Sequence, residues 1–424
     1  MQEKYKYLII GGGIAGTTAA ETLRKNDNEA NIAIISDEPR MYSRIMLSKS
    51  NFFLEKIPFD SIWLKEEKWY IDNRIDFIGD TLATKLDTQN KTVKLKDDKI
   101  LQYEKLLLAT GGEAREWPLP GTDKKGICYV RDLSQVKILM DSVRSSKQAI
   151  AIGSGFVSFE MCEMMKKAGV EEITLIMREP YYWYPVLDEE SGKMIEGAMI
   201  KGGIKIIREN EVKEILGDNS SNSSGQERIS GVVLKDGTEI PCQTAVIGIG
   251  LSCNLDWIKN AGVETNKGIL ANEYLETNLP DIYTAGDVAE FNDIILGERV
   301  QLGNWINAQK QGQVAAFNML GKREIFRMVS FYNATGFGLS ISMSGDPCPK
   351  NICNVIKRGS SNLNEAQGFT RIIIDQNNEI VGGTFINRPQ DMAPVNKLIE
   401  SNFKISSHES ELANPNFDLK QLIN

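Results

Sequence analysis

The chain is almost without histidine, because His408 near the C-terminus is the only one among 424 residues. A Ser-His-Asp triad, a histidine acid or base and a histidine-rich metal centre are therefore not expected, and we predict no metal site. Long apolar runs are also missing, since none approaches the roughly 20 residues that a membrane helix needs. No charged leader precedes the first apolar strand, which is expected from about Tyr5. We therefore expect a cytoplasmic protein with no membrane partner.

An excess of positive charge is missing as well. The chain has 49 basic and 57 acidic residues, which gives a net charge of −8. A nucleic-acid partner is not expected from this balance, because binding a phosphate backbone requires a basic face. The length favours two or three domains, since it exceeds what one hydrophobic core usually serves.

Clustered cysteines are nearly absent too. Six cysteines are scattered along the chain, and only Cys348 and Cys353 lie close together in sequence. A chain of this size does not need disulfides to fold, so these two are expected to be ordinary loop or strand residues. The alternative is that they form a redox-active pair.

A glycine fingerprint begins the chain. An apolar strand at 5–10 enters a glycine turn, and residues 17–24 continue with helical character. In such a turn Gly11 permits the sharp bend, Gly13 lets the backbone approach a pyrophosphate, and Gly16 lets helix and strand pack closely. The pyrophosphate then lies at the helix N-terminus, where N–H groups and the helix dipole favour anions. The expected contacts are Gly11, Gly13, Ile14, Ala15 and Gly16.

Acidic residues follow the next expected strand, at 31–35. This strand ends at Ser36, and Asp37 and Glu38 come directly after it. A carboxylate at this position can accept hydrogen bonds from ribose hydroxyls. Asp37 and Glu38 are therefore the candidate ribose-binding residues.

A weaker copy of the fingerprint follows an apolar strand at 149–152. Its first two glycines are Gly153 and Gly155, and Ser158 replaces the third. A helix is expected over 159–168, as in the first copy. Two copies in equivalent strand-turn-helix settings are far more specific than one, so we interpret both as nucleotide-binding turns.

The strand after the second copy departs from the pattern. Met177 stands where a carboxylate is expected, and Arg178 follows it. A cation there would favour a 2′-phosphate and hence NADPH. The alternative is that Arg178 faces solvent and that the site binds either nicotinamide nucleotide without preference, or binds none. The aromatic run Tyr181–Tyr184 is expected to pack at a domain edge. Stacking on the adenine of a nicotinamide cofactor, or docking of an acceptor, is the alternative.

The repeat extends beyond the glycines. After the first copy a hairpin is expected at 92–101, and an apolar strand ends at the turn 109–112. After the second copy the corresponding features are a hairpin at 229–240 and a strand ending at Gly250. Two doubly wound units, each with an inserted antiparallel hairpin, explain this pattern best.

A third motif, at 277–287, contains a candidate ligand-binding carboxylate. The segment 277–287 delivers Asp287 just past Gly286, at the end of a short strand. Ligands of open α/β sheets bind at the carboxyl ends of strands, where Asp287 can accept from ribitol hydroxyls. Because Asp287 lies far along the chain from Gly11, we expect the first domain to be discontinuous.

The fold class predicted from these patterns is α/β. It consists of two doubly wound, Rossmann-like dinucleotide-binding domains with inserted antiparallel hairpins, and a C-terminal α+β domain. In the C-terminal domain strands are expected at 338–343, 369–374 and 379–385, followed by a helix at 393–402. The expected boundaries are 1–112 and 249–322 for the first dinucleotide-binding domain, 113–248 for the second, and 323–424 for the C-terminal domain.

Together these residues resemble the FAD-dependent pyridine nucleotide–disulfide oxidoreductase superfamily over about 5–320. The strings at 109–112 and 277–287 make the resemblance specific. The segment 37–49 is similar to the branch that contains the reductases of rubredoxin and of 2Fe–2S ferredoxin. Disulfide reductases of the superfamily carry Cys-x4-Cys after the first ribose-binding strand, but this chain has no cysteine between Asp37 and Asp60. A thiolate relay at the flavin is therefore not expected.

The resemblance implies FAD and either NADH or NADPH as cofactors. By this resemblance the first dinucleotide-binding domain, at 1–112 and 249–322, is the FAD-binding domain, the second, at 113–248, is the NAD(P)-binding domain, and 323–424 is an interface domain. It places Lys49 and Glu160 together beside flavin N5, where a lysine can stabilise reduced, anionic flavin and a glutamate can hold it. The alternative is that both are ordinary solvated charges. The other FAD contacts that it implies are Asp37, Glu38, Arg44, Ala83, Ala109, Thr110, Gly111, Arg115, Gly286, Asp287 and Trp305. The nicotinamide nucleotide contacts are Gly153, Gly155, Phe156, Val157, Glu160, Arg178 and Gly250.

The reaction that the resemblance implies is hydride transfer from NAD(P)H to FAD, followed by one-electron transfers. The acceptor would be rubredoxin, a ferredoxin or a small molecule, and relatives suggest a homodimer. Three alternatives stay open. In the first, the protein is a thiol or disulfide reductase that uses Cys348 and Cys353. In the second, it is a flavin-binding redox or interaction protein whose nicotinamide site has decayed. In the third, it is a subunit of a larger assembly. The substitutions at Ser158 and Met177 keep the second alternative open.

Overall fold

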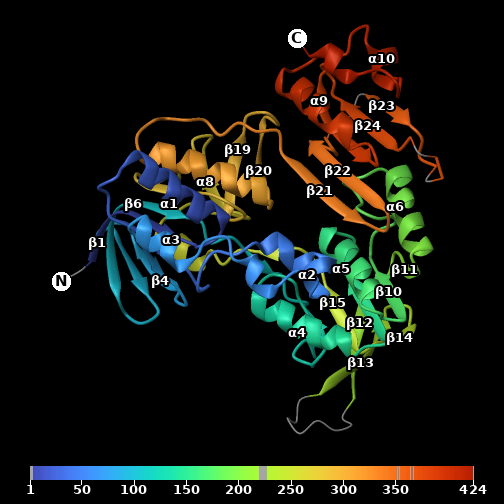
Figure 1. Cartoon of the computed structure of the whole chain (residues 1–424), viewed down its shortest axis with the longest axis horizontal. Coiled ribbons are helices and arrows are strands. Elements are labelled where there is room, and N and C mark those ends of the chain that lie inside the picture. The colour runs from blue at the N-terminus through green and yellow to red at the C-terminus, as the bar shows by residue number, and fades with distance from the viewer. Residues whose placement is uncertain are drawn as a thin grey trace. The chain divides into compact units, whose positions relative to one another are not determined.

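The computed structural model describes residues 3–218, 227–350, 352, 354–362, 364, 365 and 367–423. Its backbone forms two compact units, each assembled from three stretches of the chain (Figure 1). The first unit comprises Met1–Ser43, Asp60–Glu113 and Leu251–Met328, and the second comprises Arg44–Phe59, Ala114–Gly250 and Val329–Asn424. Both mix helices with strands, so the expected α/β class is confirmed at this level. The division into three domains stays a prediction.

The first unit is built on a seven-stranded sheet in the order β3-β2-β1-β6-β5-β4, with β18 also paired to β6. β3, β2, β1, β6 and β18 run parallel, whereas β4, β5 and β6 pair antiparallel. The hairpin expected at 92–101 is thus the β5–β6 pair. The strands are β1 (Glu3–Ile10), β2 (Ile32–Ile35), β3 (Ile75–Ile78), β4 (Ala83–Asp87), β5 (Thr92–Leu95), β6 (Ile100–Leu108) and β18 (Ile282–Thr284).

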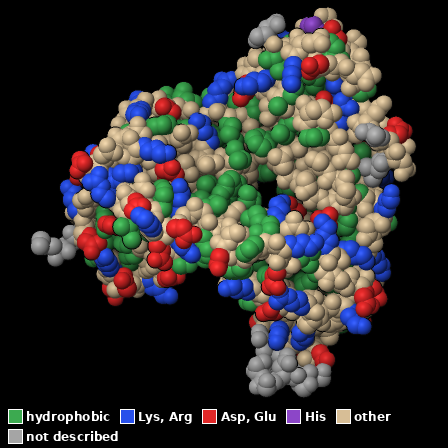
Figure 2. All heavy atoms as spheres, viewed as in Figure 1, with side chains coloured by type: hydrophobic (Ala, Val, Ile, Leu, Met, Phe, Trp, Pro, Cys, Tyr) green, Lys and Arg blue, Asp and Glu red, His purple; other side chains and the backbone are tan. Residues whose placement is uncertain are grey.

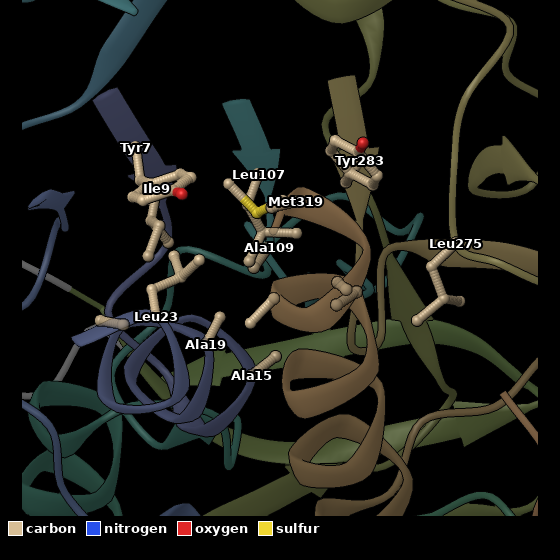
Figure 3. Close-up of a cluster of buried hydrophobic side chains, with 14 of the residues drawn as sticks. Tyr7, Ile9, Ala15, Ala19, Leu23, Leu107, Ala109, Leu275, Tyr283 and Met319 are labelled. Carbon is tan, nitrogen blue, oxygen red and sulfur yellow. The ribbon is translucent and has the colours of Figure 1, made fainter. Parts of the chain in front are cut away.

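Both faces of this sheet are buried, because successive side chains of β1 enter two different apolar clusters. Tyr7 and Ile9 pack into the cluster that α1 (Ile14–Asn26) and α8 (Trp305–Met319) share, as Figure 3 shows. Leu8 and Ile10, which alternate with Tyr7 and Ile9, enter the cluster on the opposite face, as the two-residue period of a strand requires. The other elements of this unit are α3 (Glu67–Asp72), α7 (Asp256–Lys259), β17 (Ile269–Ala271), β19 (Ala289–Asp293) and β20 (Glu298–Gln301).

The second unit contains a parallel sheet in the order β11-β10-β9-β15-β8 and an antiparallel sheet in the order β12-β13-β14. The strands are β8 (Ile127–Cys128), β9 (Gln148–Ile152), β10 (Glu172–Ile176), β11 (Ile204–Ile207), β12 (Val212–Asp218), β13 (Arg228–Leu234), β14 (Glu239–Pro241) and β15 (Thr244–Ile247). The helices are η1 (Arg44–Ser48), α2 (Ser50–Phe53), α4 (Leu133–Arg144), α5 (Phe156–Lys167) and α6 (Glu189–Lys201). Three short elements lie where the chain passes from one unit to the other. They are η2 (Phe59–Ile62), β7 (Glu113–Ala114) and β16 (Leu251–Ser252).

The C-terminal part of the second unit is an antiparallel sheet in the order β21-β22-β25-β24-β23. Its outer strands β21 and β23 are additions to the sequence analysis, which expected only the strands between them. The helix expected from Ala393 is α9, which begins at Pro389, because proline is well tolerated in a first helical turn. The elements are β21 (Phe331–Gly336), β22 (Leu339–Gly345), β23 (Asn354–Gly359), β24 (Phe369–Ile374), β25 (Ile380–Ile386), α9 (Pro389–Glu400), α10 (Glu409–Ala413) and η3 (Leu419–Leu422).

The surface carries both signs of charge. Basic and acidic side chains are interspersed over the face drawn in Figure 2. Within the part of the chain that the structure describes, no helix has the length and apolar composition needed to cross a bilayer.

A buried arginine at the end of α1 holds the first unit together. Arg24 is almost fully buried, and its guanidinium donates hydrogen bonds to the backbone carbonyl oxygens of Asp27, Asn28, Ala30, Asn73 and Arg74. The cation therefore ties the end of α1 to the segments before β2 and β3.

We expect Arg24→Met to lower the melting temperature by roughly 5–10 °C, because each buried carbonyl left without its donor costs about 1–3 kcal/mol. Thermal unfolding followed by circular dichroism measures this. Lys25→Met is the matched control, since Lys25 is exposed and its ion pair with Glu21 lies at the surface. Equal melting temperatures for the two variants would contradict the role assigned to Arg24.

Candidate functional site

The first glycine turn is fixed by close backbone contacts. Gly11 has a positive φ of 118°, and a Cβ there would lie 2.0 Å from the carbonyl oxygen of Ala109. A Cβ at Gly16 would lie 2.0 Å from the carbonyl oxygen of Gly11. Any larger residue at either position would separate β1 from α1 or from the strand beside it.

Gly13, in contrast, faces open space. A Cβ at Gly13 would have no atom within 4 Å, although Gly11 and Gly16 on either side are crowded. Gly13 is also the N-cap of α1, and among the described residues no side chain caps this end. The first N–H groups of α1, beginning with Ile14 and Ala15, therefore have the arrangement that suits a phosphate group. These residues fit the expected pyrophosphate.

Three strand ends meet at this turn. In the register of the sheet, Ile10 pairs with Leu108, and Leu108 pairs with Thr284. The Ala109 N–H donates to the Ile10 carbonyl oxygen at 2.8 Å, and the Ala285 N–H donates to the Leu108 carbonyl oxygen at 3.2 Å. The residues after the three strands are consequently neighbours at one edge of one sheet. They are Gly11, Ala109, Thr110, Gly111, Gly286 and Asp287.

Asp287 lies beside the start of α8. A Cβ at Gly303 would be 3.6 Å from the Asp287 carboxyl carbon. Asn304 caps α8 by accepting a hydrogen bond from the Asn307 N–H at 2.9 Å. Trp305 is the first residue of α8 and is half-buried. The structure therefore places Trp305 near the segment that contacts Asp287.

The candidate ribose carboxylates follow β2, as expected. Asp37 is exposed, and the Glu38 side chain accepts a hydrogen bond from the Tyr42 hydroxyl at 2.7 Å. A Cβ at Gly12 would lie 2.7 Å from the Ser36 hydroxyl oxygen, so this strand end touches the glycine turn. Ala83 begins β4, two residues after a Thr81 N–H that donates to the Ser36 carbonyl oxygen at 2.9 Å.

The second glycine turn has the same construction in the second unit. Gly153 has a positive φ of 102°, and a Cβ there would lie 2.4 Å from the Gly248 carbonyl oxygen. Gly155 is the N-cap of α5, and a Cβ there would meet nothing within 4 Å. Phe156 and Val157 are the first residues of α5. The turn is therefore open on the side where Gly13 is open in the first copy.

Ser158 is accommodated without disturbing this turn. Its buried hydroxyl donates to the Ile152 carbonyl oxygen at 3.1 Å. The space for it comes from Gly248, where a Cβ would lie 2.7 Å from the Ser158 hydroxyl oxygen. The serine thus takes the place of the third glycine because a glycine on the facing strand makes room.

Lys49 and Glu160 form an ion pair within the second unit. Glu160 Oε1 binds Lys49 Nζ, and Glu160 Oε2 accepts a hydrogen bond from the Ser48 hydroxyl. The Glu160 side chain is 10% exposed and that of Lys49 is 38% exposed. The pairing expected from the sequence is present, and Ser48 is an additional member that the sequence did not indicate.

The end of β10 presents charges of both signs. Met177 is buried, so it presents no polar group there. The Arg178 side chain is 75% exposed, and its Nε binds Glu179 Oε1 at 3.0 Å. The pKa of Glu211 is lowered by its Lys235 partner and, less strongly, by Arg178. Arg178 therefore lies close to two carboxylates, those of Glu179 and Glu211. Neither residue was considered in the sequence analysis.

The remaining candidates of the second unit are held by the backbone. Arg44 Nη1 donates to the Arg131 carbonyl oxygen at 2.7 Å. The Arg115 N–H donates to the Gly250 carbonyl oxygen at 2.9 Å, while the Arg115 side chain is exposed. Arg131 was not among the expected site residues, because its backbone contact with Arg44 joins segments far apart in sequence.

The cysteines do not form a thiolate site in the described residues. Cys348 is exposed, and partial burial raises the pKa of its thiol, whereas Cys353 lies outside the described residues. Burial also raises the pKa of Cys128 to about 11 and that of Cys242 to about 12. A thiol that the sequence analysis overlooked is Cys253, whose Sγ lies 3.9 Å from the Asp287 carbonyl oxygen. No group of three or more His, Cys, Asp or Glu side chains suits a metal ion in the described part.

Known proteins resemble the chain over most of its length. The NAD(P)H nitrite reductase of Bacillus subtilis is 28% identical over 407 residues, which cover 95% of this chain but 48% of that protein. The ferredoxin–NAD(+) reductase subunit of the benzene 1,2-dioxygenase system of Pseudomonas putida is 27% identical over 396 residues, covering 93% of this chain and 92% of that subunit. A crystal structure of a ferredoxin reductase from Rhodopseudomonas palustris has the same fold, with a TM-score of 0.90 at 24% identity over 99% of this chain and all of that one.

The chain thus spans about half the length of the nitrite reductase and nearly all of the ferredoxin reductase subunit. The family described as pyridine nucleotide-disulphide oxidoreductase matches residues 5–312, which include both glycine turns and Asp287. The chain belongs to the pyridine nucleotide-disulphide oxidoreductase family.

Proposed function

We propose that the protein is an FAD-dependent oxidoreductase that takes electrons from NADH and passes them singly to a small carrier protein. One observation supports this most strongly. The ends of β1, β6 and β18 are in register, so the open glycine turn and Asp287 lie at one edge of one sheet. This edge offers N–H groups for a pyrophosphate and a carboxylate for ribitol hydroxyls.

The two parallel sheets are proposed as the two dinucleotide-binding domains. The first would hold FAD through the glycine turn, with Asp37 and Glu38 accepting from its ribose. The second would hold the nicotinamide nucleotide at the turn around Gly155. The antiparallel sheet from β21 to β25 is proposed as a separate C-terminal domain, and a cytoplasmic location and a homodimer stay predictions.

Lys49, Glu160 and Ser48 are proposed as the residues that act on the reaction. Bound FAD supplies the chemistry that links two-electron reduction by a nicotinamide to single-electron transfers. Lys49 would contribute positive charge that stabilises negative charge on the reduced cofactor, because opposite charges attract. Glu160 orients Lys49, and Ser48 fixes the second oxygen of Glu160. The reaction as proposed needs no histidine base, which suits a chain whose one histidine is His408.

The proposed acceptor is a small one-electron carrier such as rubredoxin or a ferredoxin. Relatives are named for reduction of a ferredoxin and of nitrite, so the acceptor differs between proteins similar to this chain. A thiol relay through Cys348 is disfavoured, because its raised thiol pKa lowers the thiolate fraction that nucleophilic attack requires.

The flavin site is tested first. We expect the purified protein to contain about one FAD per chain, and Asp287→Ala to lose most of it, because the carboxylate that binds ribitol hydroxyls is removed. Absorbance of FAD released on denaturation measures the content. Asp281→Ala, at the other end of the same short strand, is the control and should keep its flavin. A colourless wild-type protein that cannot be reconstituted with FAD would refute the proposed function.

We expect Lys49→Met to slow flavin reduction by NADH roughly 10- to 100-fold, because a charge that stabilises the transition state is lost. Anaerobic stopped-flow absorbance at saturating NADH measures this rate. Lys56→Met is the matched control, since Lys56 is an exposed lysine of the same segment. If both variants reduce their flavin at the wild-type rate, Lys49 is an ordinary surface charge.

The choice of nicotinamide cofactor follows from the charges around Arg178. Because Glu179 and Glu211 lie close to this arginine, a 2′-phosphate would encounter two carboxylates as well as the cation. We therefore expect the wild-type protein to prefer NADH.

We expect Glu179→Gln to raise kcat/KM for NADPH about tenfold relative to NADH, because removing one like charge changes binding by about 1.4 kcal/mol. Steady-state kinetics with both nucleotides measures the ratio. Glu214→Gln, which removes an exposed carboxylate on β12, serves as the control. A wild-type preference for NADPH would show instead that Arg178 binds the 2′-phosphate.

A further inference from the structure

The aromatic run after β10 contains one hydroxyl with a specific target. Tyr182 is fully buried, and its phenol donates a 2.7 Å hydrogen bond to the carbonyl oxygen of Gly155. Gly155 is the second glycine of the second fingerprint and the N-cap of α5. Packing at a domain edge, as expected from the sequence, accounts for the burial of this ring but not for the hydrogen bond.

The Gly155 carbonyl oxygen accepts two hydrogen bonds. The Phe159 N–H donates to it at 3.2 Å as part of α5, and the Tyr182 hydroxyl is the second donor. Because a peptide group is planar, fixing this carbonyl also fixes the N–H of Phe156 on the other side of the same peptide. That N–H belongs to the first turn of α5, whose N–H groups have no acceptor within the helix.

Gly155 cannot fix this peptide by itself. It has no side chain, and a Cβ there would meet nothing within 4 Å. The absence of a side chain allows a phosphate to approach. It also gives the backbone at Gly155 more conformational freedom than any other residue type would have there. The Phe159 N–H restrains this peptide from within α5, and the Tyr182 hydroxyl adds a second, shorter hydrogen bond from outside the turn.

Tyr182 is itself held by the buried Glu196 and by its partner Arg208. Its N–H donates to Glu196 Oε1 at 2.9 Å, and Arg208 Nε donates to Glu196 Oε2 at 2.9 Å. A Cβ at Gly192 would lie 2.7 Å from the Tyr182 carbonyl oxygen, so α6 packs directly against this backbone. The position of the hydroxyl is therefore set by α6 together with Arg208, the residue after β11.

We propose that Tyr182 is a positioning residue for the nicotinamide nucleotide, because its phenol orients the Gly155–Phe156 peptide for the pyrophosphate. The proposal rests on the proposed function, since it takes this turn as the nicotinamide nucleotide site. Burial raises the pKa of Tyr182 far above its usual range, so the phenol remains a donor throughout the working pH range.

The test compares binding with turnover in Tyr182→Phe, which removes only the hydroxyl. We expect the dissociation constants for NADH and for redox-inert ADP-ribose to rise about fivefold by isothermal titration calorimetry, while kcat at saturating NADH stays at the wild-type value. Hydrogen exchange of the 153–157 segment should become faster in the free protein. Tyr181→Phe is the matched control, because Tyr181 lies in the same segment without a contact to Gly155 in the described structure.

The outcomes separate this inference from the function beneath it. Unchanged affinity and exchange in Tyr182→Phe would overturn the positioning role and leave Tyr182 as a space-filling residue. A large drop in melting temperature with parallel losses of affinity and kcat would overturn it in favour of a general structural role. If the wild-type protein binds neither NADH nor ADP-ribose, the proposed function itself fails, and the inference fails with it.

Discussion

The register between β1, β6 and β18 is the constraint on which the first unit depends. Two backbone hydrogen bonds carry it past the strand ends, from Ala109 to Ile10 and from Ala285 to Leu108. They bring together residues that are distant in sequence, since the Thr284 hydroxyl also binds the Leu108 carbonyl oxygen across 176 positions. The contacts leave no space for a side chain at Gly11. Sheet pairing, glycine placement and the position of Asp287 are thus one interdependent arrangement, and the proposed cofactor site is its consequence.

The two glycine turns show how one geometry is reached with different residues. In the first, Gly16 lies so close to the Gly11 carbonyl that no side chain fits. In the second, Ser158 occupies the equivalent place, and the facing strand contributes Gly248 in compensation. The Ser158 hydroxyl also donates a hydrogen bond to the Ile152 carbonyl oxygen, so it is not left without a partner in the core. Ser158, which first suggested a weakened second site, therefore fits in the turn, because Gly248 just after β15 leaves room for its hydroxyl.

Much of the fold could be predicted from local patterns, because alternating apolar residues and glycine turns fix strands and their ends. Asp287 was also predictable, since a strand end in a parallel sheet determines where the next residue lies. What escaped prediction depends on contacts between distant segments. Ser48 joins Glu160, Cys253 approaches Asp287, and Tyr182 reaches Gly155, yet none of these pairs has a sequence spacing that marks it. The outer strands β21 and β23 were missed for another reason, because each contains an asparagine and a glycine, which are uncommon in strands.

The discontinuity of the first unit has a consequence for synthesis on the ribosome. The sheet edge that would receive FAD needs β18, which emerges only after the whole 114–250 segment of the second unit. Until Asp287 has left the exit tunnel, β6 is paired in parallel with β1 but lacks β18, so the end of β6 at 106–108 has no strand on its other side. Nascent chains of this protein must therefore pass through a stage in which the sheet is incomplete and the cofactor cannot be enclosed. We expect chaperones to bind mainly at that stage, because the unpaired edge of β6 is then exposed.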